Sequence, residues 1–265
     1  MSRTGRPGLV AGLVAGLVLA SALAGCATGE ATGTSNGSTA SGAEGPRGRV
    51  VVLAAASLTE AFTAIEKDFE AAHPGLDVAI SFGASSTLVQ QVNHGAPADV
   101  IALAGESAAK PLDRALVKDE QVFASNVLEV AVPPSNPGRV TGIQDLGRPG
   151  LKVVLCAPTV PCGMAADAAF AKARVVPSVV SREMDVKATL AKVRLGEADA
   201  AVVYHSDVVA AKGAVTGIEV PASLNTVLRY PILRLDDEAA TRAFVDFVMG
   251  ADAGRSLNAS GLGPP

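Results

Sequence analysis

Two serine residues in this chain stand where an apolar strand gives way to a helix. Ser57 follows the run 50–56, and Ser85 comes shortly after the run 76–82. The backbone N–H groups at a helix N-terminus lack intrahelical partners and carry a partial positive charge, so they attract a small oxyanion without any Lys or Arg. Serine hydroxyls at the same junctions add donors. Two such junctions meeting at one place would form an uncharged, donor-rich anion site.

Both serines also fit other roles. Ser57 and Glu60 have the Ser-x-x-Glu spacing of a capping box, and Ser85 fits a simple helix cap. A serine hydrolase would use Ser57 or Ser85 as nucleophile and His205 as base. However, the Gly-x-Ser-x-Gly turn is missing, and Asp207 is the only evident carboxylate to orient the histidine. The sequence therefore favours binding over catalysis, and we expect no enzyme activity.

The order of the expected elements brings these junctions to one edge of a sheet. Strands are expected at 50–56, 76–82, 98–104, 151–156, 200–204 and 228–235. Helices are expected at 58–72, 86–94, 185–195 and 238–249, and an Ala-rich helix is expected to follow Gly163 and to end at about Arg174. This alternation, with apolar strands, indicates an α/β fold with parallel, doubly wound sheets. Ligands of such sheets bind beyond the carboxyl ends of strands, where Ser57, Ser85, the 157–163 loop and Tyr204 all lie.

Breaks in the pattern predict two lobes with a cleft between them. The Pro/Gly-rich stretch 133–138 is expected to carry the chain into a second lobe, and a second crossing is expected near 225–231. These crossings divide the folded part into lobe I (49–131 plus 230–265) and lobe II (132–229).

Composition narrows the classes of partner. The chain has 265 residues, of which 49% are hydrophobic and 18% charged, so it can bury a large core. The net charge is −4, aromatic residues make up 3%, Trp is absent, and no Lys/Arg run occurs. These features argue against nucleic acid as a partner. We expect a monomer.

The N-terminus has the features of an export signal. Arg3 and Arg6 precede the apolar stretch 8–20, and Leu-Ala-Gly leads directly to Cys26. This arrangement resembles the lipobox of bacterial lipoproteins, which implies a signal peptide over 1–25 and a lipidated Cys26. The alternative, a transmembrane anchor, needs a longer and less Gly-rich span. Gly, Ser, Thr and Ala supply 17 of the 22 residues from 27 to 48, so 26–48 is expected to tether an extracytoplasmic body to the cell membrane.

The two other cysteines lie close together. Cys156 and Cys162 are expected to form a disulfide, because export leads to an oxidising compartment; two buried free thiols are the alternative. A zinc site would need further ligands nearby. His73, His94 and His205 are distant in sequence, so we expect no metal site.

Six short segments follow one another in a recognisable order. They are Ala-Ala-Ala-Ser-Leu-Thr at 54–59, Ser-Ser-Thr-Leu at 85–88, Gly-Ala-Pro-Ala-Asp-Val at 95–100, Val-Pro-Cys-Gly at 160–163, Asp-Val-Lys at 185–187, and Val-Val-Tyr-His-Ser-Asp at 202–207. Together they resemble the molybdate-binding proteins that serve ABC importers, over about 49–258. The resemblance implies a two-lobed periplasmic-binding-protein type II fold, with the ligand in the cleft between the lobes.

The same resemblance implies which residues bind the ligand. The side-chain hydroxyls of Ser57, Ser85 and Tyr204 and the backbone N–H groups of Cys162 and Val186 would hold molybdate, and tungstate also. Many relatives have Ala at the position of Cys162, which a backbone donor tolerates. The protein would need no cofactor and would deliver the anion to a membrane permease.

A site made only of donors matches the chemistry of this ligand. Molybdate is a full dianion at neutral pH and only accepts hydrogen bonds, whereas phosphate retains a proton that needs an acceptor. Neutral donors also avoid burying a counter-charge. A sulfate- or phosphate-binding protein of the same two-lobed type is the alternative, and pocket size would decide between molybdate and sulfate.

Overall fold

The computed structural model describes residues 46–265. The expected signal peptide (1–25), the lipidation site Cys26 and nearly all of the expected tether (26–48) lie outside the described residues. Across 46–265, no helix combines the length and the apolar character needed to cross a membrane.

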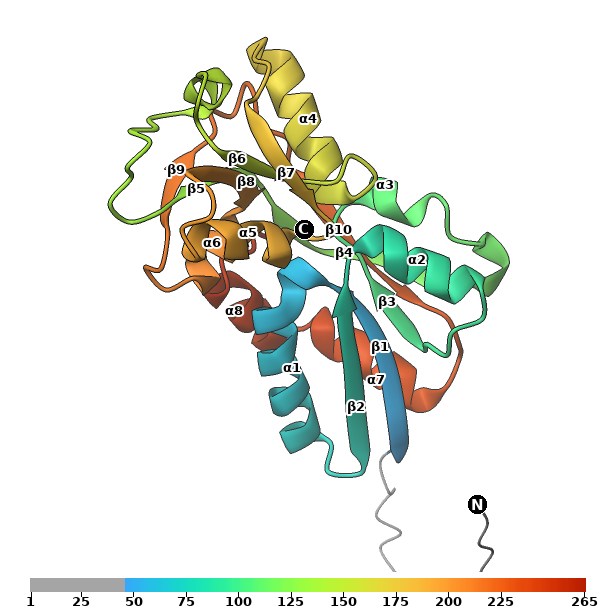
Figure 1. The fold of residues 1–265 in the computed structure, drawn as a ribbon. Helices are drawn as coiled ribbons and strands as arrows, with labels where there is room; N and C mark the ends of the chain where they lie inside the picture. Colours follow the sequence, from blue (N-terminus) through green and yellow to red (C-terminus); the bar gives the residue numbers. More distant parts are fainter. Residues whose placement is uncertain (1–45) are drawn as a thin grey trace, which may run out of the picture. The chain divides into compact units, whose positions relative to one another are not determined.

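The first lobe is built on a mixed five-stranded sheet with the order β2-β1-β3-β10-β4. Its strands are β1 (Gly48–Ala55), β2 (Leu76–Gly83), β3 (Val100–Ala102), β10 (Leu228–Arg234) and β4 (Asp119–Asn126). Strands β1, β2 and β3 are parallel, while β10 runs antiparallel to both of its neighbours. The three parallel strands point their carboxyl ends toward the second lobe (Figure 1).

Helices cover both faces of this sheet. They are α1 (Thr59–Ala72), α2 (Ser85–Asn93), α3 (Glu106–Ala109), α7 (Ala239–Val248) and α8 (Ala251–Ala259). Alternation along the strands separates the two faces: Val52 packs with the phenylalanines of α1 and α7, whereas Leu53 and Ile101 pack with α2 and α3. Because both faces are apolar, the strands read as continuous hydrophobic runs, as parallel sheets do.

The second lobe repeats this arrangement with the order β7-β6-β8-β5-β9. Its elements are β5 (Leu128–Val132), β6 (Val153–Cys156), α4 (Pro161–Ala173), β7 (Val179–Glu183), α5 (Val186–Arg194), β8 (Ala200–Tyr204), α6 (His205–Ala210) and β9 (Thr216–Glu219). Strands β6, β7 and β8 are parallel, and β5 runs antiparallel to β8 and β9. In each five-stranded sheet, four strands thus run in one direction, and one strand, β10 or β5, runs against them and begins where the chain has just crossed over.

The first crossing differs from the predicted one. The chain passes between the sheets at Val127, which separates β4 from β5, and not at 133–138, which instead forms turns after β5. No Gly or Pro marks the real crossing, because a single residue suffices to lead one extended strand into the next. Strand β5 therefore belongs to the second lobe. The second crossing lies between the end of β9 at Glu219 and the start of β10 at Leu228.

Candidate functional site

The structure brings all five predicted site residues to the lining of one cavity between the lobes. Ser57 and Ser85 come from the first lobe, and Cys162, Val186 and Tyr204 come from the second. Each of the five residues is at most 4% exposed. The cavity offers about 20 Å³ to the centre of a water molecule, and none of the residues from 46–265 that line it is Lys, Arg or His. It is a small, partly open space with donor groups around it.

The two first-lobe serines have partners within the protein. Ser57 lies in the 3-10 turn between β1 and α1, and its Oγ is 3.0 Å from the hydroxyl of Tyr230. Ser85 is the first residue of α2, and its Oγ accepts a hydrogen bond from the backbone N–H of Ala104 at 2.9 Å. Neither hydroxyl caps its own helix, so the helix-cap alternatives are not what the structure has.

Backbone donors of the second lobe lie at two helix N-termini. Cys162 follows Pro161 in the first turn of α4, and Val186 is the first residue of α5. The first N–H groups of an α-helix have no intrahelical acceptor. Asp185, which also lines the cavity, caps α5 by accepting from the N–H of Ala188 at 2.8 Å. Its carboxylate is thereby directed to the helix backbone.

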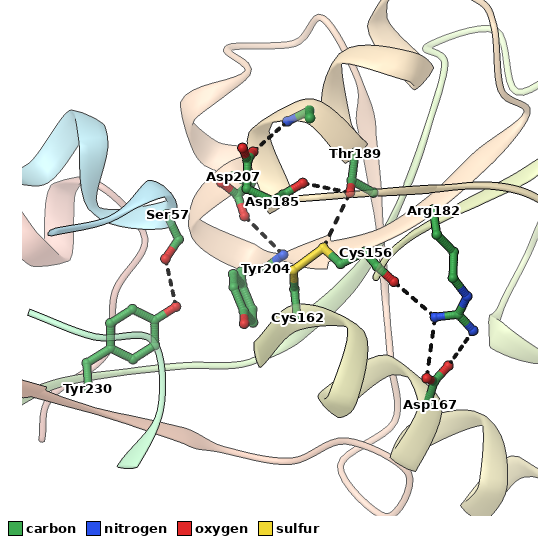
Figure 2. Close-up of a disulfide and its surroundings, with 11 residues drawn as sticks. Ser57, Cys156, Cys162, Asp167, Arg182, Asp185, Thr189, Tyr204, Asp207 and Tyr230 are labelled. Atoms are coloured by element: carbon green, nitrogen blue, oxygen red, sulfur yellow. Dashed lines mark hydrogen bonds and ion pairs between the residues drawn. A yellow bond between two sulfur atoms is a disulfide. The ribbon is translucent and has the colours of Figure 1, made fainter. Parts of the chain in front are cut away.

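A disulfide and a glycine shape the loop that carries Cys162. Cys156, at the end of β6, is bonded to Cys162, as the sequence predicts, with the two Cα atoms 5.8 Å apart (Figure 2). At Gly163 an added Cβ would overlap the carbonyl oxygen of Ala157, so this close approach requires glycine. Both features fix where the start of α4 meets the cavity.

Tyr204 differs from the serines because its hydroxyl has no partner. The residue ends β8 and is 1% exposed, and within 46–265 no group forms a hydrogen bond with its OH. Burial raises the pKa of Tyr204 well above its usual value, so the phenol keeps its proton. A buried hydroxyl without a partner is costly unless a ligand supplies one.

Charged groups lie beside the cavity and bridge the two lobes. Lys187 of α5 pairs with Glu60 of α1 at 2.6 Å and with Asp207 of α6 at 3.2 Å. Burial raises the pKa of Asp207 to about 6, although Lys187 acts in the opposite direction. Glu60 is absent from the lining, so its charge is directed to Lys187 and away from the cavity.

The arrangement expected of a hydrolase is not assembled. His205 does not line the cavity; its Nδ1 lies 2.7 Å from Oε2 of Glu129. Among residues 46–265, no group of three or more His, Cys, Asp or Glu side chains is placed to hold a metal ion.

Sequence reasoning missed several residues around the site. These are Tyr230, Asn126, Lys187 and Asp207, which touch the predicted residues or each other. The chain contains only two tyrosines, and their rings pack edge to face with centroids 6.3 Å apart. Because tyrosine is so rare in this sequence, its rarity was the one feature that could have pointed to Tyr230 as a residue near the site.

Comparison with known proteins shows the family. Residues 50–263 match the bacterial extracellular solute-binding proteins. The chain belongs to this family. As a solute-binding protein it is not an enzyme, in agreement with the sequence analysis.

Named relatives of this solute-binding protein agree with the predicted resemblance. It is 37% identical to the molybdate-binding protein ModA of Mycobacterium tuberculosis H37Rv, over 86% of this chain and 89% of the relative. It is 32% identical to ModA of Escherichia coli K12, over 82% and 89%. The structure of the periplasmic molybdate-binding protein of Azotobacter vinelandii shares the fold, with a TM-score of 0.73 and 20% identity over 82% of this chain and 99% of that one. These comparisons confirm the two-lobed α/β fold.

Proposed function

We propose that this solute-binding protein captures molybdate, and also tungstate, outside the cytoplasm and delivers it to the membrane permease of an ABC importer. The observation that carries the proposal is the cavity itself. The three hydroxyls and two helix N-termini predicted to bind an oxyanion all line it, and in the part of the chain that the structure describes no cationic side chain does. The 37% identity to a protein named for molybdate binding supports the choice of anion.

The donor set accounts for the type of anion. The oxygens of Ser57 and Ser85 already face a protein hydroxyl or N–H, and Tyr204 has a buried hydroxyl that lacks an acceptor. A fully deprotonated tetrahedral dianion accepts from every such group. Hydrogen phosphate would bring a proton, and the one carboxylate that lines the cavity among residues 46–265, that of Asp185, is directed to the N-terminus of α5, so that proton would be buried unpaired.

Attachment to the membrane is part of the proposal. A lipidated Cys26 and the Gly/Ser/Thr/Ala tether would keep a monomeric body near its permease. Mass spectrometry of the membrane fraction tests this anchor: a diacylglyceryl-modified Cys26 at the N-terminus supports it. An unmodified N-terminus upstream of Cys26 contradicts it.

Sulfate is the second candidate, because it is also a tetrahedral dianion that only accepts hydrogen bonds. Isothermal titration of the same preparation with molybdate, tungstate, sulfate and phosphate separates the candidates. We expect binding of molybdate and tungstate with affinity at least about a hundredfold above that for sulfate. Equal or tighter binding of sulfate, or no heat with molybdate, would contradict the proposal.

A further inference from the structure

A buried hydrogen-bonded relay, formed by Asn126, Tyr230 and Ser57, begins at the crossing between the lobes and ends beside the cavity. Asn126 is the last residue of β4, and its Nδ2 lies 2.8 Å from Oγ of Ser206 and 3.3 Å from the hydroxyl of Tyr230. The Tyr230 hydroxyl in turn lies 3.0 Å from Oγ of Ser57. Asn126, Ser206, Tyr230 and Ser57 are all at most 4% exposed. Tyr230 itself is not among the residues that line the cavity.

The direction of each hydrogen bond in this relay follows from the groups next to it. The backbone N–H of Val127 donates to Oδ1 of Asn126 at 3.0 Å, which leaves the amide NH2 group facing Tyr230 and Ser206. The NH2 group can only donate, so the Tyr230 oxygen accepts from it. The phenol still has one proton to place, and Oγ of Ser57 is the acceptor beside it. Tyr230 therefore donates to Ser57, and the Ser57 proton is left for the cavity.

We propose that Asn126 and Tyr230 are positioning residues that fix the Ser57 hydroxyl as a donor to the bound anion, so that the site rejects oxyanions that carry a proton. This inference rests on the proposed function. A serine hydroxyl rotates and can donate or accept, so an unconstrained Ser57 would also accept the proton of hydrogen phosphate. With its oxygen facing the Tyr230 O–H, Ser57 turns its own proton toward the ligand.

The same logic already holds at the other first-lobe hydroxyl. The N–H of Ala104 occupies the acceptor side of Ser85 Oγ, and a backbone N–H cannot reverse its direction. Ser57 lacks a backbone donor of this kind, and the Asn126–Tyr230 pair supplies the equivalent from side chains. Each serine oxygen then accepts one hydrogen bond from the protein, which favours directing its own proton to the cavity.

A double-mutant cycle tests the relay through its dependence on Ser57. Tyr230→Phe keeps the buried ring and removes the hydroxyl, so molybdate affinity is expected to fall about threefold to tenfold by isothermal titration. In the Ser57→Ala background the same change is expected to leave the affinity within about 1.5-fold, because no hydroxyl remains to be oriented. Tyr204→Phe serves as the matched control, since it should weaken binding in both backgrounds.

Selectivity gives a second readout that a purely structural role would not move. Tyr230→Phe is expected to lower the ratio of molybdate to phosphate affinity at neutral pH, because Ser57 becomes free to accept. Equal losses from Tyr230→Phe in both backgrounds, or no loss in the parent, would overturn the relay. If the parent itself does not bind molybdate, the proposed function fails instead, and the relay fails with it.

A second variant covers the case in which Tyr230→Phe does not fold. Asn126→Asp replaces the NH2 donor by an acceptor, so Tyr230 would donate to the carboxylate and Ser57 would donate to Tyr230. The expected result is at least about a tenfold loss of molybdate affinity in the parent, and a smaller loss in the Ser57→Ala background. A loss of the same size in both backgrounds would overturn the proposal.

Discussion

The two lobes supply hydroxyl donors to the cavity in different ways. In the first lobe, the Ser57 and Ser85 oxygens face a protein hydroxyl and an N–H, so each hydroxyl is also part of the fold. In the second lobe, the hydroxyl of Tyr204 has no partner among the described residues. The backbone donors there are held in place by a disulfide at Cys162 and by the Asp185 cap of α5 at Val186. Substitutions in the two lobes should therefore separate effects on stability from effects on affinity.

Ser85→Ala is expected to have the largest combined effect. It removes a donor to the anion, which should weaken molybdate binding about tenfold to a hundredfold. It also leaves the buried N–H of Ala104 without its acceptor, which should lower the free energy of unfolding by about 1–3 kcal/mol. Calorimetric titration and thermal unfolding without ligand measure the two effects.

Ser86→Ala is the matched control for this prediction. Ser86 is only partly buried and does not line the cavity. Its replacement should change both quantities little. If Ser86→Ala lost molybdate binding while Ser85→Ala kept it, the assignment of the donor would be wrong by one residue.

Tyr204→Phe should weaken binding to a similar degree without destabilising the ligand-free protein. The variant loses an anion donor worth about 1.5–3 kcal/mol. The ligand-free protein loses only a buried hydroxyl that has no hydrogen-bond partner within residues 46–265, so its Tm should be unchanged or slightly higher. A clear drop in Tm without ligand would contradict the contrast between the lobes.

Removing the disulfide should have the opposite effect to Tyr204→Phe: it should lower the free energy of unfolding clearly and weaken molybdate binding only slightly. Cys156 and Cys162 are six residues apart, and a cross-link over so short a loop contributes roughly 2 kcal/mol. In the double variant Cys156→Ser/Cys162→Ser, the backbone N–H at 162 remains, so affinity should fall less than about fivefold. Urea unfolding and titration of the oxidised parent and the variant test this prediction.

Asp207 should make stability depend on pH. Its pKa is about 6 in the folded protein, above the usual 3.8, because burial disfavours the carboxylate. The folded state then holds this proton more tightly than the unfolded chain, so ionisation costs stability, and the cost disappears as pH falls from about 6 toward 4. The Tm of Asp207→Asn minus the Tm of the parent should therefore be larger at about pH 7.5 than at about pH 5. A difference in Tm that does not change with pH would contradict it.

The ion pair between the lobes should have the smallest effect. The Glu60 and Lys187 side chains are 44% and 26% exposed, and exposed pairs contribute below about 1 kcal/mol. Glu60→Gln should therefore weaken binding less than about threefold, and less still at high salt. Lys187→Met should be more harmful to stability, because it leaves the buried Asp207 without its cation.

Much of the site could be predicted because its residues follow strand ends. Ser57, Ser85 and Tyr204 are each local to a strand–helix junction, and parallel strands bring such junctions together. The relay could not be found in this way. Tyr230 and Asn126 meet only because β10 pairs with β4, a pairing that joins residues 104 apart in the sequence.

Tertiary contacts also overrode two local patterns. The spacing of Ser57 and Glu60 suits a capping box, but Ser57 bonds Tyr230 and Glu60 bonds Lys187. The Pro/Gly-rich stretch 133–138 suggests the passage between lobes, yet the chain passes at Val127 within an extended run. Local signals identify turns, whereas the choice of sheet for each strand depends on distant partners.

The strand orders have a consequence for how the protein is made. All five strands of the second sheet lie between Leu128 and Glu219, in one continuous stretch of chain. In the first sheet, β4 pairs along its length only with β10, and β3 also needs β10 to cover one edge. A chain that emerges from its N-terminus can therefore complete the second lobe while the first lobe still has two unpaired strand edges. The later lobe is then the one exposed to aggregation and to chaperones until β10 arrives.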